Sequence, residues 1–370
     1  MAGSRRTGIA HLPLHPGKAP RWLFQRMVKL SHEIVIAIVS EFGADEMLKR
    51  LSDPFWFQSL SCVLGWDWHS SGTTTVVCGA IKESIKDINH ELGLYAAGGK
   101  GGTSRKTPAE VTKVGDDTGL DAEPLVYASK MSAKVDNTAV QDGYQLYHHS
   151  FFFTDKGQWA VVQQGMNNVN NYARRYHWLG ETVQDYVCEP HAGICTQVRG
   201  QTLNLVAQQS EKARGVVTRL AAEKSPDKML AEIKHLQSCD LPARHQIVAR
   251  DIHPDRLYKT FVSTYELKAP DFESLLAIPG VGPKTIRALS LLSELLYGTA
   301  PSMSDPARFS FAHGGKDGIP YPVDRPTYDK TIDVLKNAVR KAKLGIREEM
   351  EALRRLHRVF DRDYQGTLVK

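Results

Sequence analysis

The chain has 370 residues and a formal net charge of +6, with 24% charged and 42% hydrophobic residues. This length exceeds the needs of a simple binding module, so we expect two or three domains. The five cysteines include no Cys-x-x-Cys pair, which favours a reduced, cytoplasmic protein. The longest apolar run near the start, residues 34–39, is too short to cross a membrane, so we expect no membrane partner.

Helical periodicity dominates the first part of the chain. Apolar residues recur at helical spacing over 21–51, which indicates one or two helices, and again over 73–89. Thr107 and Pro108, with Glu110 in the first turn, predict the start of a further helix.

A glycine-rich loop is expected just before that helix. Residues 98–107 contain Lys100, Arg105 and Lys106 and no acid. Backbone amides in such a loop can surround a phosphate, and the three cations add to the attraction. The loop lacks the Gly-Lys-Ser/Thr order of an ATP-binding loop, so we expect it to contact DNA and not a nucleoside triphosphate.

After residue 143 the helical spacing of apolar residues gives way to a pattern typical of β-strands. Residues 144–154 and 158–165 are rich in aromatic and β-branched residues and are separated by Asp-Lys-Gly, so they predict a β-hairpin. Residues 167–179, 226–237 and 324–362 are predicted to be mostly helical.

These elements predict an α+β chain in which helices dominate. We expect a β-hairpin-containing N-terminal α+β domain over 1–240, which would hold the chemistry, and an all-α C-terminal domain over 241–370. The boundary between these two domains falls between residues 238 and 269, where the sequence pattern defines it least sharply.

Two polar clusters are candidates for catalysis. Asp67 and His69 are two residues apart, so on a strand they would share a face and converge on a metal or a phosphate. Asp142 precedes the hairpin and His148 lies on its first strand. An acid placed ahead of a hairpin resembles metal-dependent nucleases of the restriction-enzyme type, although the returning strand here carries two glutamines instead of a carboxylate and a lysine. The predicted ligands of Mg²⁺ or Mn²⁺ are therefore Asp67, His69 and Asp142, while His148 has a core histidine as its alternative.

A basic and aromatic stretch follows the hairpin. Arg174, Arg175 and Trp178 would pair with phosphates and stack on unpaired bases if they faced solvent on the predicted helix. For the neighbouring tyrosines, Tyr172 and Tyr176, packing in the core is an equally good interpretation.

The most specific motif lies between two apolar helical stretches. Residues 277–285 read Ala-Ile-Pro-Gly-Val-Gly-Pro-Lys-Thr, and the two glycines permit positive φ and close approach of a phosphate at a helix N-terminus. We interpret 270–298 as a helix-hairpin-helix element that grips the DNA backbone, with an αα-hairpin used only for packing as the alternative. The residues expected to contact DNA here are Gly280, Val281, Gly282, Lys284 and Thr285.

Four segments resemble a prokaryotic family catalogued as domain of unknown function 763. The likeness extends from about residue 6 to 353, and it implies an archaeal or bacterial protein with a helix-hairpin-helix near its C-terminus. The family label names no reaction. The segments that carry the resemblance are Pro54 to Phe57, Trp66 to Gly72, Asp142 to His149 and Ala312 to Gly318.

The sequence therefore predicts a DNA-binding protein of genome maintenance, and most directly a metal-dependent nuclease. One alternative is a DNA glycosylase or abasic-site lyase. Lys284 stands where the nucleophile of helix-hairpin-helix lyases stands, and Asp324 resembles their assisting aspartate, at a longer spacing than in that family. The other alternative is a non-catalytic DNA-binding protein. Duplex, junction or flapped DNA are all compatible partners, and the sequence does not specify the oligomeric state.

Overall fold

A five-stranded antiparallel sheet forms the centre of the protein. The computed structural model describes residues 19–66, 70–196, 199–239, 252–307, 333, 335–340 and 350–355. The strand order is β1-β3-β4-β5-β6. These strands are β1 (Leu94–Lys100), β3 (Gln145–Thr154), β4 (Trp159–Asn167), β5 (Tyr172–Leu179) and β6 (Gly193–Cys195), and a separate two-stranded sheet pairs β2 (Val140–Gln141) with β7 (Leu203–Asn204).

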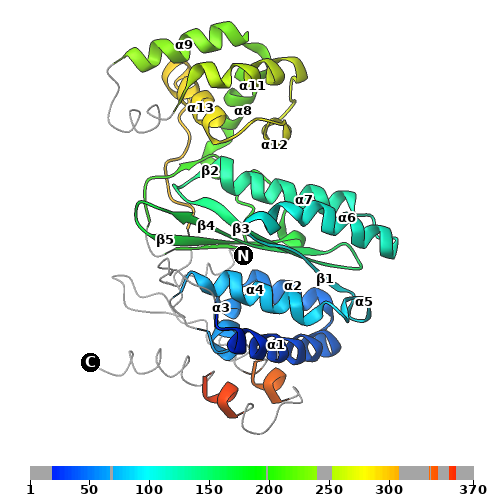
Figure 1. Cartoon of the computed structure of the whole chain (residues 1–370). Helices are drawn as coiled ribbons and strands as arrows, with labels where there is room; N and C mark the ends of the chain where they lie inside the picture. Colours follow the sequence, from blue (N-terminus) through cyan, green and yellow to red (C-terminus); the bar gives the residue numbers. More distant parts are fainter. Residues whose placement is uncertain are drawn as a thin grey trace, which may run out of the picture.

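Helices cover both faces of the large sheet (Figure 1). One face carries the helices of the N-terminal segment, and the other carries the two that follow β1. The first set is α1 (Arg21–Phe42), α2 (Ala44–Ser52), α3 (Pro54–Val63) and α4 (Gly72–Ile85), with the short α5 (Asn89–Leu92) beside it. The second set is α6 (Thr107–Thr118) and α7 (Glu123–Lys134), preceded by the 3₁₀ segment η1 (Gly101–Lys106) and followed by the π-helical turn η2 (Val135–Ala139).

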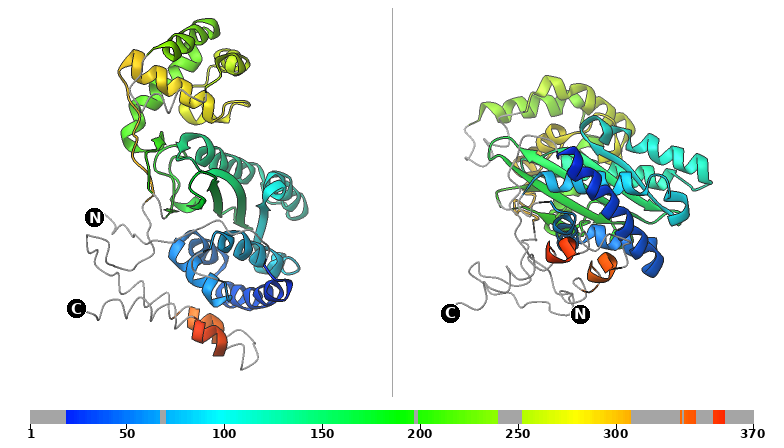
Figure 2. Two further views of the ribbon diagram at one scale, coloured as in Figure 1. Left: turned by 60° about the vertical axis from the view of Figure 1, so that its left-hand side comes forward. Right: turned by 60° about the horizontal axis from the view of Figure 1, so that its bottom comes forward.

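A cluster of helices lies beyond α7, at the end of the molecule farthest from α1 (Figures 1 and 2). Its hydrophobic core is continuous with that of the sheet, because Phe151 of β3, Trp178 of β5 and Leu289 belong to one cluster of buried residues. The predicted boundary at 240/241 lies outside the described residues. The helices are α8 (Glu211–Glu223), α9 (Pro226–Ser238), α11 (Pro254–Leu267), α12 (Phe272–Ala277) and α13 (Pro283–Tyr297), and the short 3₁₀ segments η3 (Gly180–Thr182) and η4 (Gln208–Ser210) complete the described elements.

The alternation of side chains explains why the sheet is buried on both sides. On β3, Phe151 and Phe153 face the core shared with α7 and α13, whereas Phe152 faces the core formed with α1 to α4. Gly157, with φ +76°, lies in the tight turn that joins β3 to β4. The predicted hairpin is therefore confirmed, as is the α+β class with predominant helix.

Two sequence predictions about local structure are wrong. Residues 167–179 form the end of β4, a four-residue turn and β5, not a helix, and Asn171 adopts φ +58° in that turn. Asparagine tolerates this left-handed conformation, so the Asn-rich stretch is a strand connection. The loop expected over 98–107 is instead the end of β1 and η1. In the predicted helical stretch 324–362 the described residues are helical.

Among the described residues, no helix is both long and apolar enough to cross a membrane.

Candidate functional site

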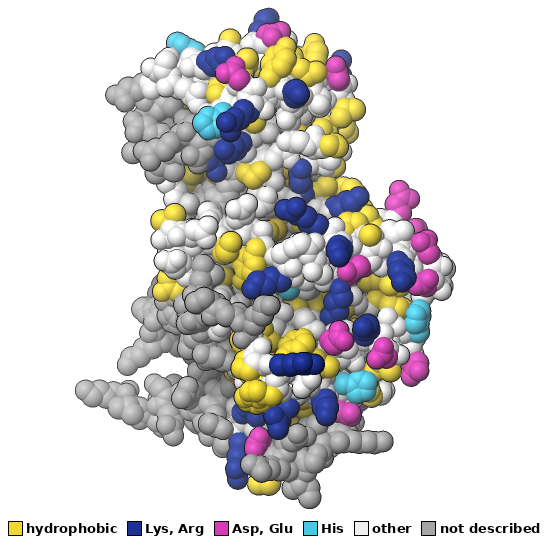
Figure 3. All heavy atoms as spheres, in the orientation of Figure 1, with side chains coloured by type: hydrophobic (Ala, Val, Ile, Leu, Met, Phe, Trp, Pro, Cys, Tyr) yellow, Lys and Arg dark blue, Asp and Glu magenta, His cyan; other side chains and the backbone are white. Residues whose placement is uncertain are grey.

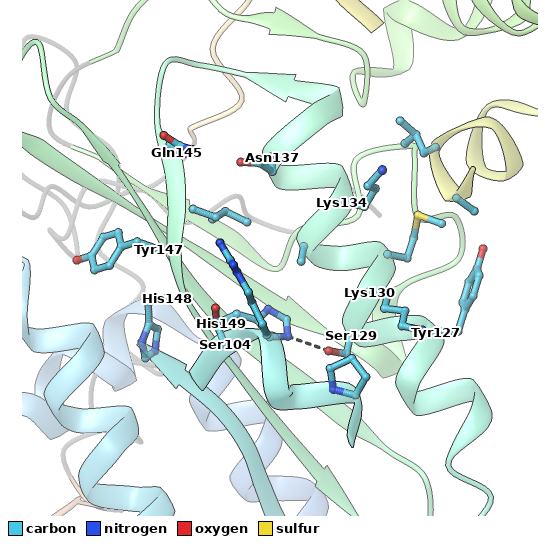
Figure 4. A pocket seen from close by; sticks show the side chains of 17 residues that line it. Ser104, Tyr127, Ser129, Lys130, Lys134, Asn137, Gln145, Tyr147, His148 and His149 are labelled. Carbon is cyan, nitrogen blue, oxygen red and sulfur yellow. Dashed lines mark hydrogen bonds between the residues drawn. The ribbon is translucent and has the colours of Figure 1, made fainter. Parts of the chain in front are cut away.

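A pocket of about 730 Å³ lies between β3, α7, η1 and the end of α12 (Figure 4). Arg105 comes from η1, Lys130 and Lys134 come from successive turns of α7, and His149 comes from β3. Leu276 and Ala277 close the pocket at the point where α12 ends. The pocket therefore begins where the turn between α12 and α13 begins.

The lining of this pocket is basic. Arg105 and Lys130 are exposed, Lys134 is half-buried, and within the described part of the chain no aspartate or glutamate contributes to the wall. Burial lowers the pKa of Lys134, because removal from water disfavours the charged ammonium group. Figure 3 shows several Lys and Arg side chains on this view of the protein at the level of α6, α7 and the helices above them. Such a lining favours an anionic ligand.

A chain of hydrogen bonds leads from the pocket wall into the protein. Ser129 Oγ lies 2.9 Å from His149 Nε2, and His149 Nδ1 lies 2.7 Å from Gln163 Oε1. Gln163 Nε2 donates to Asp136 Oδ2 at 2.5 Å and to the carbonyl of Ser132 at 3.1 Å. Figure 4 marks the hydrogen bond between Ser129 and His149 with a dashed line.

Asp136 is the inner end of this chain. Its side chain is fully buried in η2, and it also accepts hydrogen bonds from Trp178 Nε1 at 2.9 Å and from His191 Nε2 at 2.5 Å. A carboxylate with this many donors is well compensated for its loss of water. Asp136 therefore holds β4, β5 and the segment around His191 in one arrangement.

Asp142 does not occupy the position expected of a metal ligand. Its side chain is completely buried, and its Oδ2 accepts from Arg174 Nη1 at 2.8 Å and from the Tyr176 hydroxyl at 2.6 Å. Arg174 also forms a two-pronged ion pair with Asp305, with N–O distances of 3.1 and 2.7 Å. Burial raises the pKa of Asp142, while Arg174 opposes that shift. These contacts are those of a structural ion-pair network.

The basic and aromatic surface predicted after the hairpin is not formed by the residues expected. Arg174, Arg175 and Trp178 are no more than 1% exposed. Because β5 alternates, Trp178 faces the core with α7, and Arg175 faces α3, where it donates to Gln58 Oε1 at 3.0 Å. Neither arginine is placed to pair with a phosphate, and Trp178 is not placed to stack on a base.

His148 lies beside the pocket but is buried, as its alternative interpretation required. Its Nε2 lies 3.0 Å from Ser150 Oγ, and its Nδ1 has no hydrogen-bond partner among the described residues. Burial lowers the pKa of His148 to about 3, so the ring is neutral at physiological pH. A neutral, enclosed ring of this kind fits a core histidine.

The turn between α12 and α13 presents backbone to solvent. Gly280 is exposed with φ +87°, and Val281 beneath it is 1% exposed. Gly282 has φ −138°, an extended conformation open to any residue, so the positive φ expected there is not found. Lys284 is exposed in the first turn of α13, whereas Thr285 is buried and its hydroxyl lies 3.5 Å from the Gly282 amide.

Gln141 joins this turn to the sheet region. Its Nε2 donates to the carbonyl of Pro283 at 2.8 Å, and its Oε1 accepts from Arg287 Nε at 2.8 Å. On the other side, the Tyr127 hydroxyl of α7 is hydrogen-bonded to Glu273 of α12. The turn is therefore held against α7 and β2 through both of its helices.

Gly98, the first glycine of 98–107, is not placed to cradle an anion. Gly98, with φ +82°, packs against β3 so closely that an added Cβ would lie 2.3 Å from the carbonyl oxygen of His149. Its amide donates to Glu110 Oε2 at 2.9 Å, so an acid lies beside the loop after all. Lys100, Arg105 and Lys106 are nevertheless exposed.

The other predicted catalytic residues are Asp67, His69 and Asp324, and they lie outside the described residues. Within the part of the chain that the structure describes, no group of three or more His, Cys, Asp or Glu side chains is arranged to hold a metal ion. The predicted Mg²⁺ or Mn²⁺ site through Asp67, His69 and Asp142 stays a prediction.

A protein-family model described as "Protein of unknown function (DUF763)" matches residues 8–323. The chain belongs to the DUF763 family. No match was found among the curated proteins or among the solved structures. In this DUF763 protein the candidate site therefore rests on its own geometry.

In this DUF763 protein, sequence reasoning named Arg105 and His148 of the pocket wall but missed Ser129, Lys130 and Lys134. Ser129 and His149 are 20 residues apart and have no signature spacing. Lys130 and Lys134 are four apart on α7, which places them on one face, and this was the one signal that pointed to a basic helix surface.

Proposed function

We propose that this DUF763 protein binds DNA in genome maintenance, through the turn between α12 and α13. The observation that carries the proposal is the turn Pro279–Gly282, in which Pro279 and Gly280 are exposed, with Lys284 exposed in the first turn of α13. The first amides of a helix have no carbonyl partner within it, and the helix dipole adds positive potential there. A phosphate oxygen is the ligand that this combination suits best.

The surroundings of the turn favour a long polyanion as its ligand over a small anion. The pocket shares Leu276 and Ala277 with the end of α12, and its cations Arg105, Lys130 and Lys134 lie on the α7 side. A strand whose phosphates meet the turn would pass next to these cations. Since such contacts are made to the backbone, we expect little preference for base sequence.

Neither enzymatic prediction gains support from the described geometry. Lys284 is exposed, whereas a lysine that forms a Schiff base is usually desolvated so that it loses its proton. Asp142 is enclosed by Arg174 and Tyr176. Metal-dependent cleavage and lyase activity stay predictions, and the proposal is limited to binding.

Gly282→Val tests the proposal with little disturbance of the fold. The backbone of Gly282 is extended, and the nearest heavy atom to an added Cβ is 3.9 Å away, so the valine is tolerated but covers the turn. We expect the affinity of this variant for a labelled duplex to fall by about tenfold or more, because a few charge-assisted hydrogen bonds to phosphate are lost. Fluorescence anisotropy over a salt series is the measurement.

Two charge variants complete the experiment. Lys284→Gln is expected to reduce the salt dependence of log K by about one unit. Lys156→Gln is the matched control, because Lys156 is exposed in the β3–β4 turn beside Asp45 of α2, on the opposite face of the sheet. If folded Gly282→Val binds DNA as tightly as the wild type does, the turn is not the DNA site.

A further inference from the structure

The serine and the histidine at the pocket form a hydrogen-bonded pair with a defined direction. Gln163 Nε2 faces two acceptors, Asp136 Oδ2 and the Ser132 carbonyl, so the amide oxygen must be the atom that faces His149. An oxygen acceptor requires His149 Nδ1 to carry the proton. His149 Nε2 is then unprotonated and carries a lone pair, and the Ser129 hydroxyl donates a hydrogen bond to this nitrogen.

This is the arrangement of a nucleophile and its general base. A hydroxyl that donates to a neutral imidazole, with the second ring nitrogen held by an orienting group, is the pattern of serine and cysteine hydrolases. Both side chains line the pocket, although they are only 2% and 5% exposed. The pair is thus shielded from bulk water while it borders the space in which a ligand would lie.

The charges of the pocket select the substrate class. Arg105, Lys130 and Lys134 line the space, and no carboxylate is among the described residues that line it. Peptides and neutral esters would gain little from three cations, whereas a phosphodiester presents a negative charge in both ground and transition states. The pocket also adjoins the turn that we propose to hold DNA phosphates.

We propose that the Ser129–His149 pair hydrolyses phosphodiesters in this pocket, with Ser129 as the nucleophile and His149 as the general base. The substrate class rests on the proposed DNA binding, and the reaction extends it. Arg105, Lys130 and Lys134 supply positive charge to the phosphoryl group.

The reaction balances with water as the only co-reactant. Ser129 Oγ bonds to phosphorus, its proton passes to His149 Nε2, and the bond from phosphorus to one ester oxygen breaks. That oxygen leaves on the side of phosphorus opposite Ser129 Oγ, takes a proton from a water molecule and departs as an alcohol, so that hydroxide remains. The hydroxide then attacks the phosphoserine from that same side, and His149 gives its proton back to Ser129 Oγ as the phosphate monoester departs.

A nucleoside p-nitrophenyl phosphodiester is the direct probe, because its turnover does not require DNA to bind at the turn. The wild-type chain is expected to release p-nitrophenolate with chelator present, and Ser129→Ala and His149→Gln are expected to lose about a hundredfold or more of this rate. Ser263→Ala is the control, since Ser263 is a half-buried helical serine on α11 that does not line the pocket and donates to the carbonyl of Lys259.

A second measurement does not depend on a variant that folds. A fluorophosphonate probe is expected to label the wild-type chain at Ser129, as mapped by mass spectrometry, and inorganic phosphate or a mononucleotide should slow the labelling. The proposal is overturned by a wild type with no turnover, by turnover that requires a divalent metal, by a folded Ser129→Ala that retains activity, or by labelling elsewhere. Loss of DNA binding in Gly282→Val with normal labelling at Ser129 would separate the two proposals.

Discussion

Arg174→Met is expected to lower the free energy of unfolding by about 3–5 kcal/mol, because it leaves two buried carboxylates without their cation. Arg174 is 1% exposed and lies between Asp142 and Asp305, whose side chains are 0% and 6% exposed. The methionine keeps most of the packing volume but supplies no positive charge. Urea unfolding followed by circular dichroism measures the difference.

Two further variants show whether the loss comes from the ion pairs. Arg219→Met removes an exposed arginine from α8 and should change stability by less than about 0.5 kcal/mol. Asp142→Asn keeps the shape of the network and removes one of its two negative charges, so its effect should be smaller than that of Arg174→Met. A change below about 1 kcal/mol in Arg174→Met would show that the network is not a structural one, and would reopen a functional role for Asp142.

The protein is expected to lose stability steeply in mild acid. His148, His149 and His177 are buried, and burial lowers the pKa of each below 6.5, to about 3 for His148. Below pH 6.5 the unfolded chain binds protons that the folded chain does not, so stability is fully present above pH 6.5 and is lost as the pH falls toward the folded pKa values.

The size of this effect follows from the number of groups. Each buried histidine contributes up to about 1.4 kcal/mol per pH unit, so three together reach about 4 kcal/mol per unit. Asp142 acts in the opposite sense, because burial raises its pKa and the folded state takes up a proton first. Three histidines oppose one aspartate, so the net slope should remain positive, with stability rising as the pH rises toward 6.5.

Urea unfolding as a function of pH tests the prediction. His148→Gln is expected to reduce the slope by the share of one histidine, whereas His235→Gln, a change at an exposed position on α9, should leave it unaltered. A free energy of unfolding that stays constant through this pH range would contradict the buried, neutral state of the three rings.

The elements that could be predicted are those whose hydrophobic pattern is regular. The helices over 21–51 and 226–237 and the β3–β4 hairpin follow from periodicity, because each has one apolar period and recognisable turn residues. The turn at Gly280 was also found, since its signal is confined to a few adjacent residues.

The strand β5 was missed because its interior is polar. Arg174 and Arg175 are buried on opposite faces of the sheet, and an arginine in sequence is normally read as a surface residue. Burial of Arg174 is offset by two carboxylates, Asp142 and Asp305, and Asp305 lies 131 residues from Arg174 in the chain. Sequence alone cannot show that pairing, and the same limit explains why Ser129 and His149 were not connected.

The polar side chains inside the sheet also fix its alignment. Gln163 and Gln164 of β4 point to opposite faces, where Gln163 meets Asp136 and Gln164 meets Thr74 of α4 and the carbonyl of Ser71. A slip of one residue between strands would exchange the two faces and separate every one of these donors from its acceptor. An all-apolar interior would accept such a slip at little energetic penalty. The buried polar groups therefore give this sheet a single register. They also make it less tolerant of isolated substitutions, because a change on one strand requires a matching change on the helix that faces it.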